Sequence, residues 1–405
     1  MEKLFALLNH ALQNVTGFIY PNEVELHWNI LIVIYPYITG LVAGAFILAS
    51  LERVFNVKEV QPTYRLSLLT ALAFLIVAPL PLQAHLARPE RGIEMFLTPH
   101  LQSAMAMFGF VYLWYLLAVL LLEIWFDYRD NIVHWSRSET GIKKIIYKIL
   151  TLGTTDVSEQ SIALDRKIGK FITIIGIPSA FLLHGYVGFI FGSVKANPWW
   201  SSVLMPIVFL FSAIVSGIAM VLLLYMISNF LRGKKNNMPC LDKLGSYLLY
   251  VMLIDFSLES LDFIQRLYEA EESIKILGEM VRSKLFISLI VSQVIIGTVL
   301  PILSLAFVKL IRTAEAFRRA IYFITAILVQ IGIFSIRWNV VIGGQLFSKS
   351  FRGLTVYKVE LFGIEGLLMA IGLLVLPFVI LWILVKILPP WSESDLSIDP
   401  LRNQR

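Results

Sequence analysis

Long, nearly charge-free runs of apolar residues recur along the chain and predict its architecture. A hydrocarbon core of about 30 Å needs roughly 20 apolar residues of helix to cross it. Runs of about that length occupy residues 28–51, 66–87, 100–125, 169–194, 199–231, 244–266, 285–309, 319–337 and 364–387. The pattern therefore predicts an all-α integral membrane protein with about nine transmembrane helices.

Polar segments divide these runs into groups. A long polar insertion at 127–170 falls inside the first four spans, four more spans follow residue 195, and one helix is left over. We therefore expect two four-helix bundles plus one C-terminal helix. The expected parts are an amphipathic N-terminal segment lying on the outer membrane surface (1–26), a first bundle (27–195), a second bundle (196–345), an outer loop with the ninth helix (346–390) and a cytoplasmic tail (391–405).

The insertion at 127–170 contains the string GIKKIIYKIL. Its Ile and Leu spacing favours an amphipathic helix on the cytoplasmic surface, with a plain connector as the alternative. Loops on this face also carry about two thirds of the 34 Lys and Arg residues. Since positive loops stay on the cytoplasmic side, we expect the N-terminus outside and the C-terminus inside a cytoplasmic (inner) membrane.

Composition narrows the chemistry that the chain can perform. Hydrophobic residues make up 58% and charged residues 15% of the sequence, against about a quarter charged in soluble domains. The formal charge of +6 follows from the loop bias and does not indicate nucleic-acid binding. Cys240 is the one cysteine, so the chain can form neither an internal disulfide nor a cysteine-ligated iron–sulfur cluster.

Three carboxylates mark the span at 244–266 as a candidate site. Asp255, Glu259 and Asp262 are spaced by four and three residues, so they lie on one helix face between mid-membrane and the outer surface. Three such groups cannot all be ionised cheaply in a low dielectric. Either a cation such as Arg337 or Arg266 compensates them, or some are protonated and can transfer protons; a solvated helix end is the plainer alternative.

Histidines and arginines gather at the same outer end. His27 opens the first span, His85 and Arg88 follow the second, and His100 opens the third. A side chain with a pKa near neutrality can both donate a hydrogen bond and accept a proton, as a quinone head group requires. His184, about midway along the fourth span, extends the polar path or is simply a hydrogen-bonded core residue. We expect these groups to converge in one pocket beneath the outer surface.

Three stretches of the chain resemble a known family. HWNILIVIYPYITGLVAGAFILASL, HLARPERGIEMFLTPHLQSAMAMFG and RWNVVIGGQLFSKSFRGL look like the NrfD, or polysulfide reductase membrane-subunit, family. They are spread over residues 27–354, with Ala87 where that family usually has Gly. The IGGQLFSKSFRGL run is most similar to the DsrP-type branch of sulfur metabolism; the hydrogenase and alternative complex III branches share much of the pattern.

The resemblance implies a subunit without haem or iron–sulfur cluster that binds menaquinone or ubiquinone near the outer face. Its implied partner is a ferredoxin-like [4Fe–4S] subunit docked outside, with cytochrome c and further membrane subunits in the same complex. His85 and Arg88 match the family loop and Arg337 its late motif, while His27 stands where the family places quinone contacts. His27, His85, Arg88, His100 and Arg337 are thus the expected quinone-binding residues.

Two other functions agree with the same residues. A cytochrome b-like subunit would use histidines on neighbouring helices as haem ligands. A secondary transporter would bind a cation at the carboxylates and move one bundle against the other. The lack of a cluster-binding motif and the outer concentration of titratable groups favour the quinone-binding subunit.

Overall fold

The chain folds into a bundle of long helices, as the apolar runs predict. The computed structural model describes residues 15–98, 102, 104–269, 273–311 and 313–391. Its long helical segments are α2 (Ile30–Arg53), α3 (Tyr64–Val77) with α4 (Leu80–His85), α6 (Ala104–Leu113) with the π-helical η4 (Trp114–Leu121) and α7 (Leu122–Ser138), α9 (Glu159–Gly192), α10 (Met205–Leu231), α11 (Met238–Glu269), the π-helical η5 (Phe286–Val299) with α13 (Leu300–Leu310), α14 (Glu315–Val341) and α15 (Leu367–Ile387).

Eight of these segments are long and apolar enough to cross a membrane, within the part of the chain that the structure describes. The other, α11, has the length but carries Asp255, Glu259 and Asp262 on its outer half. All nine coincide with the apolar runs of the sequence. The prediction of an all-α, multi-pass membrane protein is confirmed.

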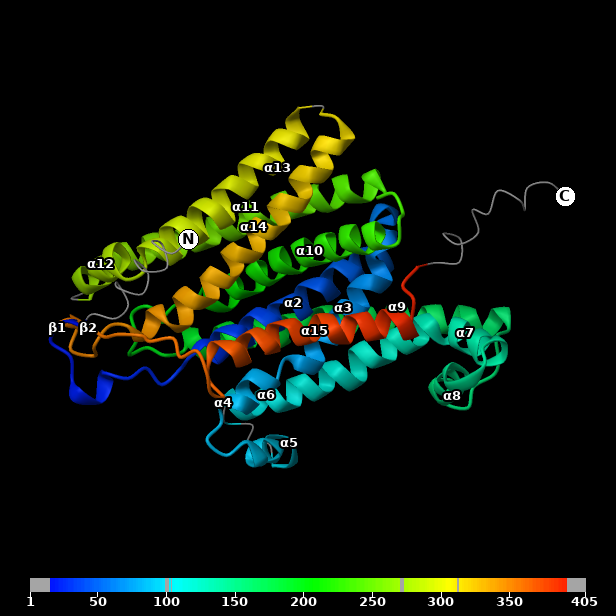
Figure 1. Ribbon diagram of the computed structural model, residues 1–405, viewed down its shortest axis with the longest axis horizontal. Coiled ribbons are helices and arrows are strands. Elements are labelled where there is room, and N and C mark those ends of the chain that lie inside the picture. Colours follow the sequence, from blue (N-terminus) through cyan, green and yellow to red (C-terminus); the bar gives the residue numbers. More distant parts are fainter. Residues whose placement is uncertain (1–14, 99–101, 103, 270–272, 312, 392–405) are drawn as a thin grey trace.

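Short elements cover the two ends of the bundle. They are β1 (Thr16–Gly17), β2 (Gly353–Leu354), α5 (Glu94–Leu97), α8 (Gly141–Leu150) and α12 (Ile274–Ser283). Figure 1 shows β1, β2 and α12 at one end and α8 at the other. We call these the outer end and the inner end, after the orientation that the basic residues predict. Successive spans run in opposite directions, so in a set of nine described spans the first and the last both begin at the outer end.

Helix α2 forms the centre of the bundle. It packs against α3 and α9 of the expected first group of helices, and most extensively against α10 of the second. At that contact Gly44 and Gly217 touch through their backbones, since a Cβ on Gly44 would lie 2.8 Å from Cα of Gly217. Small residues permit such close approach between membrane helices. The two groups of four helices therefore share one continuous core.

Helices α7 and α9 continue beyond the apolar runs into the expected insertion at 127–170. Arg129 of α7 joins them, because its Nε donates to Asp165 at 2.6 Å and its Nη2 donates to Ser161 at 2.6 Å. This buried network explains why polar sequence remains helical here, and it reduces the insertion to α8 and short connectors. The amphipathic helix predicted from GIKKIIYKIL is confirmed as α8.

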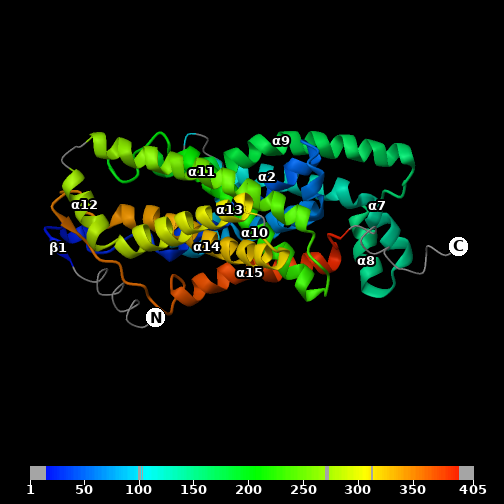
Figure 2. The ribbon, with the colours of Figure 1, turned by 90° about the horizontal axis from the view of Figure 1, so that it is seen from above.

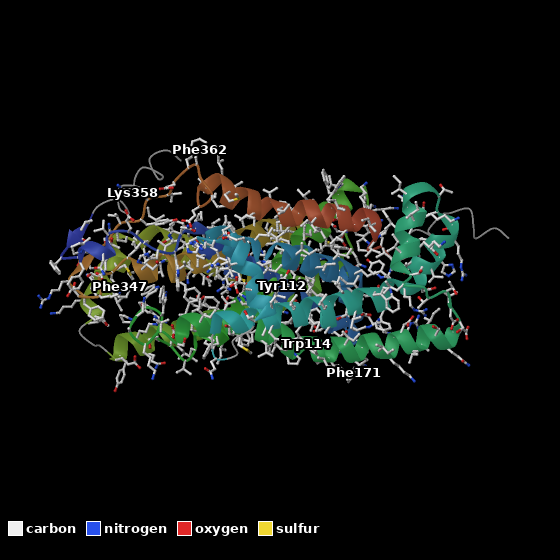
Figure 3. All side chains as sticks on the ribbon, turned by 90° about the horizontal axis from the view of Figure 1, so that it is seen from below. Tyr112, Trp114, Phe171, Phe347, Lys358 and Phe362 are labelled. Atoms are coloured by element: carbon white, nitrogen blue, oxygen red, sulfur yellow. The ribbon has the colours of Figure 1, made fainter. Side chains whose placement is uncertain are left out.

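The outer end is closed by segments distant in sequence. Strand β1 pairs with β2 in an antiparallel sheet of the described chain, so the amphipathic segment expected at 1–26 is extended, not helical, at Thr16–Gly17. Residues 1–14 lie outside the described residues. In Figure 3, Phe347, Lys358 and Phe362 of the loop before α15 lie at the end of the molecule opposite α8. Gln345 binds both the backbone N–H and the carbonyl of Trp28, which joins the late motif to the start of α2.

Candidate functional site

A buried arginine lies where the two groups of helices meet. Arg337 of α14 is fully buried, and its Nη2 donates to Ser212 of α10 at 2.7 Å and to Nε2 of His184 at 3.2 Å. Its guanidinium carbon lies 4.2 Å from the centre of the Phe209 ring. A charged group in the membrane normally faces the protein interior and has a polar partner. Arg337 meets both conditions, and some of its nitrogen atoms have no hydrogen-bond partner among the described residues.

The hydrogen bonds of His184 define its tautomer. The Thr39 hydroxyl donates to the carbonyl oxygen of Tyr35 at 3.0 Å. Its oxygen lies 3.3 Å from Nδ1 of His184 and therefore accepts the proton of that nitrogen. Nε2 is then the lone-pair nitrogen that accepts from Arg337. His184 is thus a neutral imidazole that connects α2 to the buried guanidinium.

Two of the predicted carboxylates act electrostatically on Arg337. They are Asp255 and Glu259 of α11. Within the described residues, Nε and Nη1 of Arg337, Oδ1 of Asp255 and Oε1 of Glu259 are buried without a hydrogen-bond partner. Compensation of these carboxylates by a cation stays a prediction, and hydrogen-bonding capacity remains on the guanidinium and on both carboxylates.

A cavity of about 300 Å³ adjoins this group on its outer side. It lies between α10, α11, η5 and α14, and most of its wall is apolar, with Phe256, Leu289, Val294 and Ile336 among the lining residues. Sites for small organic ligands are typically such concave apolar spaces with a few converging polar groups.

The polar part of the cavity wall is a short chain of hydrogen bonds. Asn339 of α14 donates through Nδ2 to Gln293 at 2.8 Å, and Gln293 donates through Nε2 to Glu259 at 3.3 Å. Oδ1 of Asn339 and Oε1 of Glu259 accept no hydrogen bond from the described chain. Gln293 belongs to η5, and π-helical segments are frequent at functional sites because they redirect side chains. Glu259 and Asn339 thus line the cavity, and each has one acceptor atom without a partner among the described residues.

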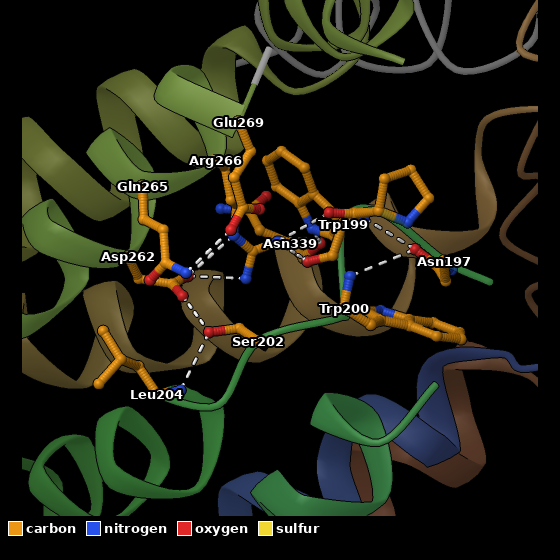
Figure 4. A network of polar contacts seen from close by, with 11 residues as sticks. Asn197, Trp199, Trp200, Ser202, Leu204, Asp262, Gln265, Arg266, Glu269 and Asn339 are labelled. Carbon is orange, nitrogen blue, oxygen red and sulfur yellow. Dashed lines mark hydrogen bonds and ion pairs between the residues drawn. The ribbon is translucent and has the colours of Figure 1, made fainter. Parts of the chain in front are cut away.

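The third predicted carboxylate also lines the cavity, toward its outer end. Asp262 accepts two hydrogen bonds from Arg266, at 2.9 and 2.7 Å, and a third from Ser202. Arg266 also donates to the carbonyl of Trp199, whose indole Nε1 donates to the carbonyl of Asn339 at 2.9 Å. Figure 4 shows how these contacts join the connector before α10 to α11 and α14. Asp262 is therefore an ion-paired wall residue.

The remaining predicted residues lie elsewhere. His85 pairs through Nδ1 with Glu365 at 3.0 Å, next to Asn29 at the start of α2. His27 and Arg88 are exposed at the outer end, and His100 lies outside the described residues. The expected single pocket thus divides, with Arg337, His184, Asp255 and Glu259 together inside the bundle and His85 in a separate pair near α15.

Sequence reasoning missed one of the two amides that line the cavity. Gln293 lies within an apolar run, and a helical pattern assigns it no particular face because η5 does not follow the usual period of 3.6. The one available signal is that Gln293 is a strong hydrogen-bonding group within a span. Among the described residues, no group of three or more His, Cys, Asp or Glu side chains is arranged to hold a metal ion.

Known proteins resemble the chain over most of its length. The family model described as polysulphide reductase, NrfD, matches residues 21–349. A selenate reductase subunit of Mesobacillus selenatarsenatis is 33% identical over 78% of this chain and 73% of that protein. A putative dimethyl sulfoxide reductase membrane subunit of Halobacterium salinarum is 29% identical over 50% of this chain and 43% of its own length, and protein NrfD of Escherichia coli is 26% identical over 49% and 59%. The chain belongs to the NrfD, or polysulphide reductase, family.

Proposed function

We propose that this chain is the quinone-binding membrane subunit of a multisubunit respiratory redox complex. It exchanges electrons between menaquinone or ubiquinone and an iron–sulfur partner at the outer face. The observation that carries this proposal is the apolar cavity lined by Glu259 and Asn339, whose Oε1 and Oδ1 atoms have no hydrogen-bond partner among the described residues. Relatives named as subunits of selenate and dimethyl sulfoxide reductases support a place in a redox complex.

The lining residues fit a quinone in its reduced form. A bound quinol supplies two electrons and two protons, and its hydroxyl groups are hydrogen-bond donors. Glu259 Oε1 and Asn339 Oδ1 are acceptors that lack a donor among the described residues. The apolar wall suits the ring, while Phe263 and Ile264 line the cavity and are also exposed on the outside of α11. An isoprenoid tail can therefore leave the cavity among lipid-facing side chains.

The buried chain behind the cavity is suited to hold and pass protons. Glu259 lines the cavity, and it shares the electrostatic field of Arg337 with Asp255. Arg337 in turn donates to the neutral His184. A proton that reaches Glu259 therefore has further groups, Asp255 and His184, next to it or to Arg337, and these can bind a proton or change their hydrogen bonds. We assign proton transfer to Glu259, Asp255 and His184, with Arg337 as the fixed cation that holds them in place.

Orientation and partners follow the charge distribution. The cavity lies toward the outer end, where Asp262 and Arg266 line it. A partner with [4Fe–4S] clusters therefore docks at this end. The N-terminus is outside, the C-terminus is in the cytoplasm, and the membrane is the cytoplasmic one. Cytochrome c and other membrane subunits complete the complex.

Binding of a fluorescent quinone-site inhibitor tests the cavity. The purified chain in lipid nanodiscs is titrated with 2-heptyl-4-hydroxyquinoline-N-oxide, whose fluorescence is quenched when it binds. Val294→Phe fills the cavity, and Ile295→Phe adds the same ring at the neighbouring position, which does not line the cavity and is 45% exposed. We expect Kd to rise about tenfold or more for Val294→Phe, a change of about 1.4 kcal/mol, and to stay constant for Ile295→Phe.

A third variant distinguishes the two places where polar groups gather. His85→Ala removes the pair with Glu365 and leaves the cavity intact, so we expect an unchanged Kd. Equal binding by the wild type and Val294→Phe, with both proteins folded by circular dichroism, overturns the cavity assignment. Loss of binding in His85→Ala alone would instead place the head group beside Asn29 and Glu365.

A further inference from the structure

Helix α8 is held rigidly at the inner end. The Tyr147 hydroxyl donates to the carbonyl of Ile387 at 2.8 Å, and the Trp125 indole of α7 donates to the carbonyl of Leu150 at 2.9 Å. The rings of Tyr147 and Trp135 lie 5.2 Å apart. One side of α8 is therefore fixed against α7 and α15.

The free side of α8 is apolar. Ile142, Ile145 and Ile149 follow the i, i+3, i+7 spacing of one helix face and are 78%, 61% and 66% exposed. Leu152, just after the helix, is 71% exposed. This is a continuous stripe of large side chains that the described chain does not cover. Lys144 and Lys148 are exposed along one border of the stripe.

The position of α8 matches the depth of the membrane surface. Ile387, which Tyr147 binds, is the last residue of the spanning helix α15, so α8 lies where α15 leaves the hydrocarbon. In Figure 2, α8 lies beyond the end of α15 and runs across the direction of the long helices. A helix in this position, with an apolar stripe bordered by lysines, has the features of a helix that lies in the membrane interface.

We propose that α8 is an interfacial anchor that binds anionic phospholipids of the inner leaflet. Its isoleucine stripe enters the region between acyl chains and headgroups, and Lys144 and Lys148 bind the headgroup phosphates. The exposed positive charge bordering the stripe is complementary to an anionic leaflet, and lysine stems can lie along apolar surface while the ammonium group reaches the headgroups. This inference is independent of the quinone site.

A spin label tests where the stripe lies. Cys240 is buried, so labelling of the wild type measures a low background, and the Ile149→Cys variant carries the label on the stripe. The control is Lys235→Cys, at an exposed position on the inner loop between α10 and α11. In nanodiscs that contain this chain alone, we expect oxygen to relax the Ile149→Cys label more than aqueous nickel chelate does, and the reverse for Lys235→Cys. Equal access of the chelate to both labels overturns the proposal. That result is expected if the stripe binds another protein and is exposed to water when this chain is alone.

Lipid titration tests the lysines. Dioleoyl phosphatidylglycerol is added to the full chain in detergent, and the rise in unfolding temperature is followed, with phosphatidylcholine as the neutral comparison. Lys144→Gln with Lys148→Gln should raise the half-saturating phosphatidylglycerol concentration on the order of tenfold. Lys234→Gln with Lys235→Gln removes the same charge from the same end and should change it little. Equal curves for the two double variants contradict the assignment to α8.

Discussion

Nη2 of Arg337 donates to Nε2 of His184 at 3.2 Å, although 153 residues separate them in the sequence. This bond connects α14 to α9, and the Thr39 hydroxyl extends it to α2. The same guanidinium also interacts electrostatically with Asp255 and Glu259. One buried cation therefore joins α14 to α9 and α10 and acts on two carboxylates of α11.

Removal of that cation should destabilise the protein strongly. Arg337→Ala removes the hydrogen bonds to His184 and Ser212 and takes a nearby positive charge away from Asp255 and Glu259. Hydrogen bonds to a charged group contribute about 1.5–3 kcal/mol each. We expect a large fall in the unfolding temperature in detergent. Arg88→Ala, at an exposed outer-loop position, is the matched control and should change it little, and similar falls in both variants would argue against the central role of Arg337.

Glu259 should affect turnover more than binding. Glu259→Gln keeps the size of the side chain but cannot accept a proton, and general acid–base groups typically contribute about 10²–10⁴-fold to a rate. In the intact complex we expect the rate of quinol-dependent electron transfer to fall by about 10²-fold or more, while Kd for the inhibitor changes little. Glu269→Gln, on the same helix but exposed, should retain the wild-type rate. A normal rate in Glu259→Gln would remove this residue from the proton path.

Arg266 should control how fast a ligand leaves the cavity. Arg266→Ala breaks the contacts with Asp262 and with the Trp199 carbonyl, which hold together the wall at the outer end of the cavity. We expect the dissociation rate of the inhibitor, measured by stopped-flow fluorescence, to rise several-fold. Arg282→Ala, an exposed position on α12 at the same end, removes an equal charge and should leave the rate unchanged. Equal dissociation rates in the two variants would show that ligands leave by another route.

The contact between α2 and α10 should not tolerate a methyl group. In Gly44→Ala the new Cβ overlaps the carbonyl oxygen of Ala213 and crowds Cα of Gly217. Overpacking of this kind costs about 1–3 kcal/mol, and the unfolding temperature should fall accordingly. Gly372→Ala on α15 meets no atom within 4 Å and should be neutral or slightly stabilising. Unchanged stability of Gly44→Ala would mean that the helices can separate freely.

The sequence predicts the helices better than it predicts the site. An apolar run long enough to cross the membrane leaves the backbone no alternative to a helix, so the spans of α2, α10 and α15 follow from composition alone. The ends differ because Arg129 stabilises helical turns that are polar in sequence. Spacing within α11 also predicts that Asp255 and Glu259 share a face.

Contacts between helices cannot be predicted in the same way. The spacing of titratable groups says how deep each one lies but not which helices are neighbours, so the sequence suggests His85 beside Arg337, whereas His85 meets Glu365. The depth of His184 follows from its place in the span, while its partners Thr39 and Arg337 depend on the packing of α9 with α2 and α14. Gln293 has no recognisable pattern around it, because the π-helical turn that orients it is a property of the folded chain.

The backbone contact of Gly44 with Gly217 also limits how the protein can work. A carrier that exposes its site alternately to the two sides must move one helical group relative to the other. Here the two groups meet at a place without side chains that could change rotamer to accommodate sliding. Such a junction favours one fixed arrangement of the two groups over the relative movement that a carrier requires.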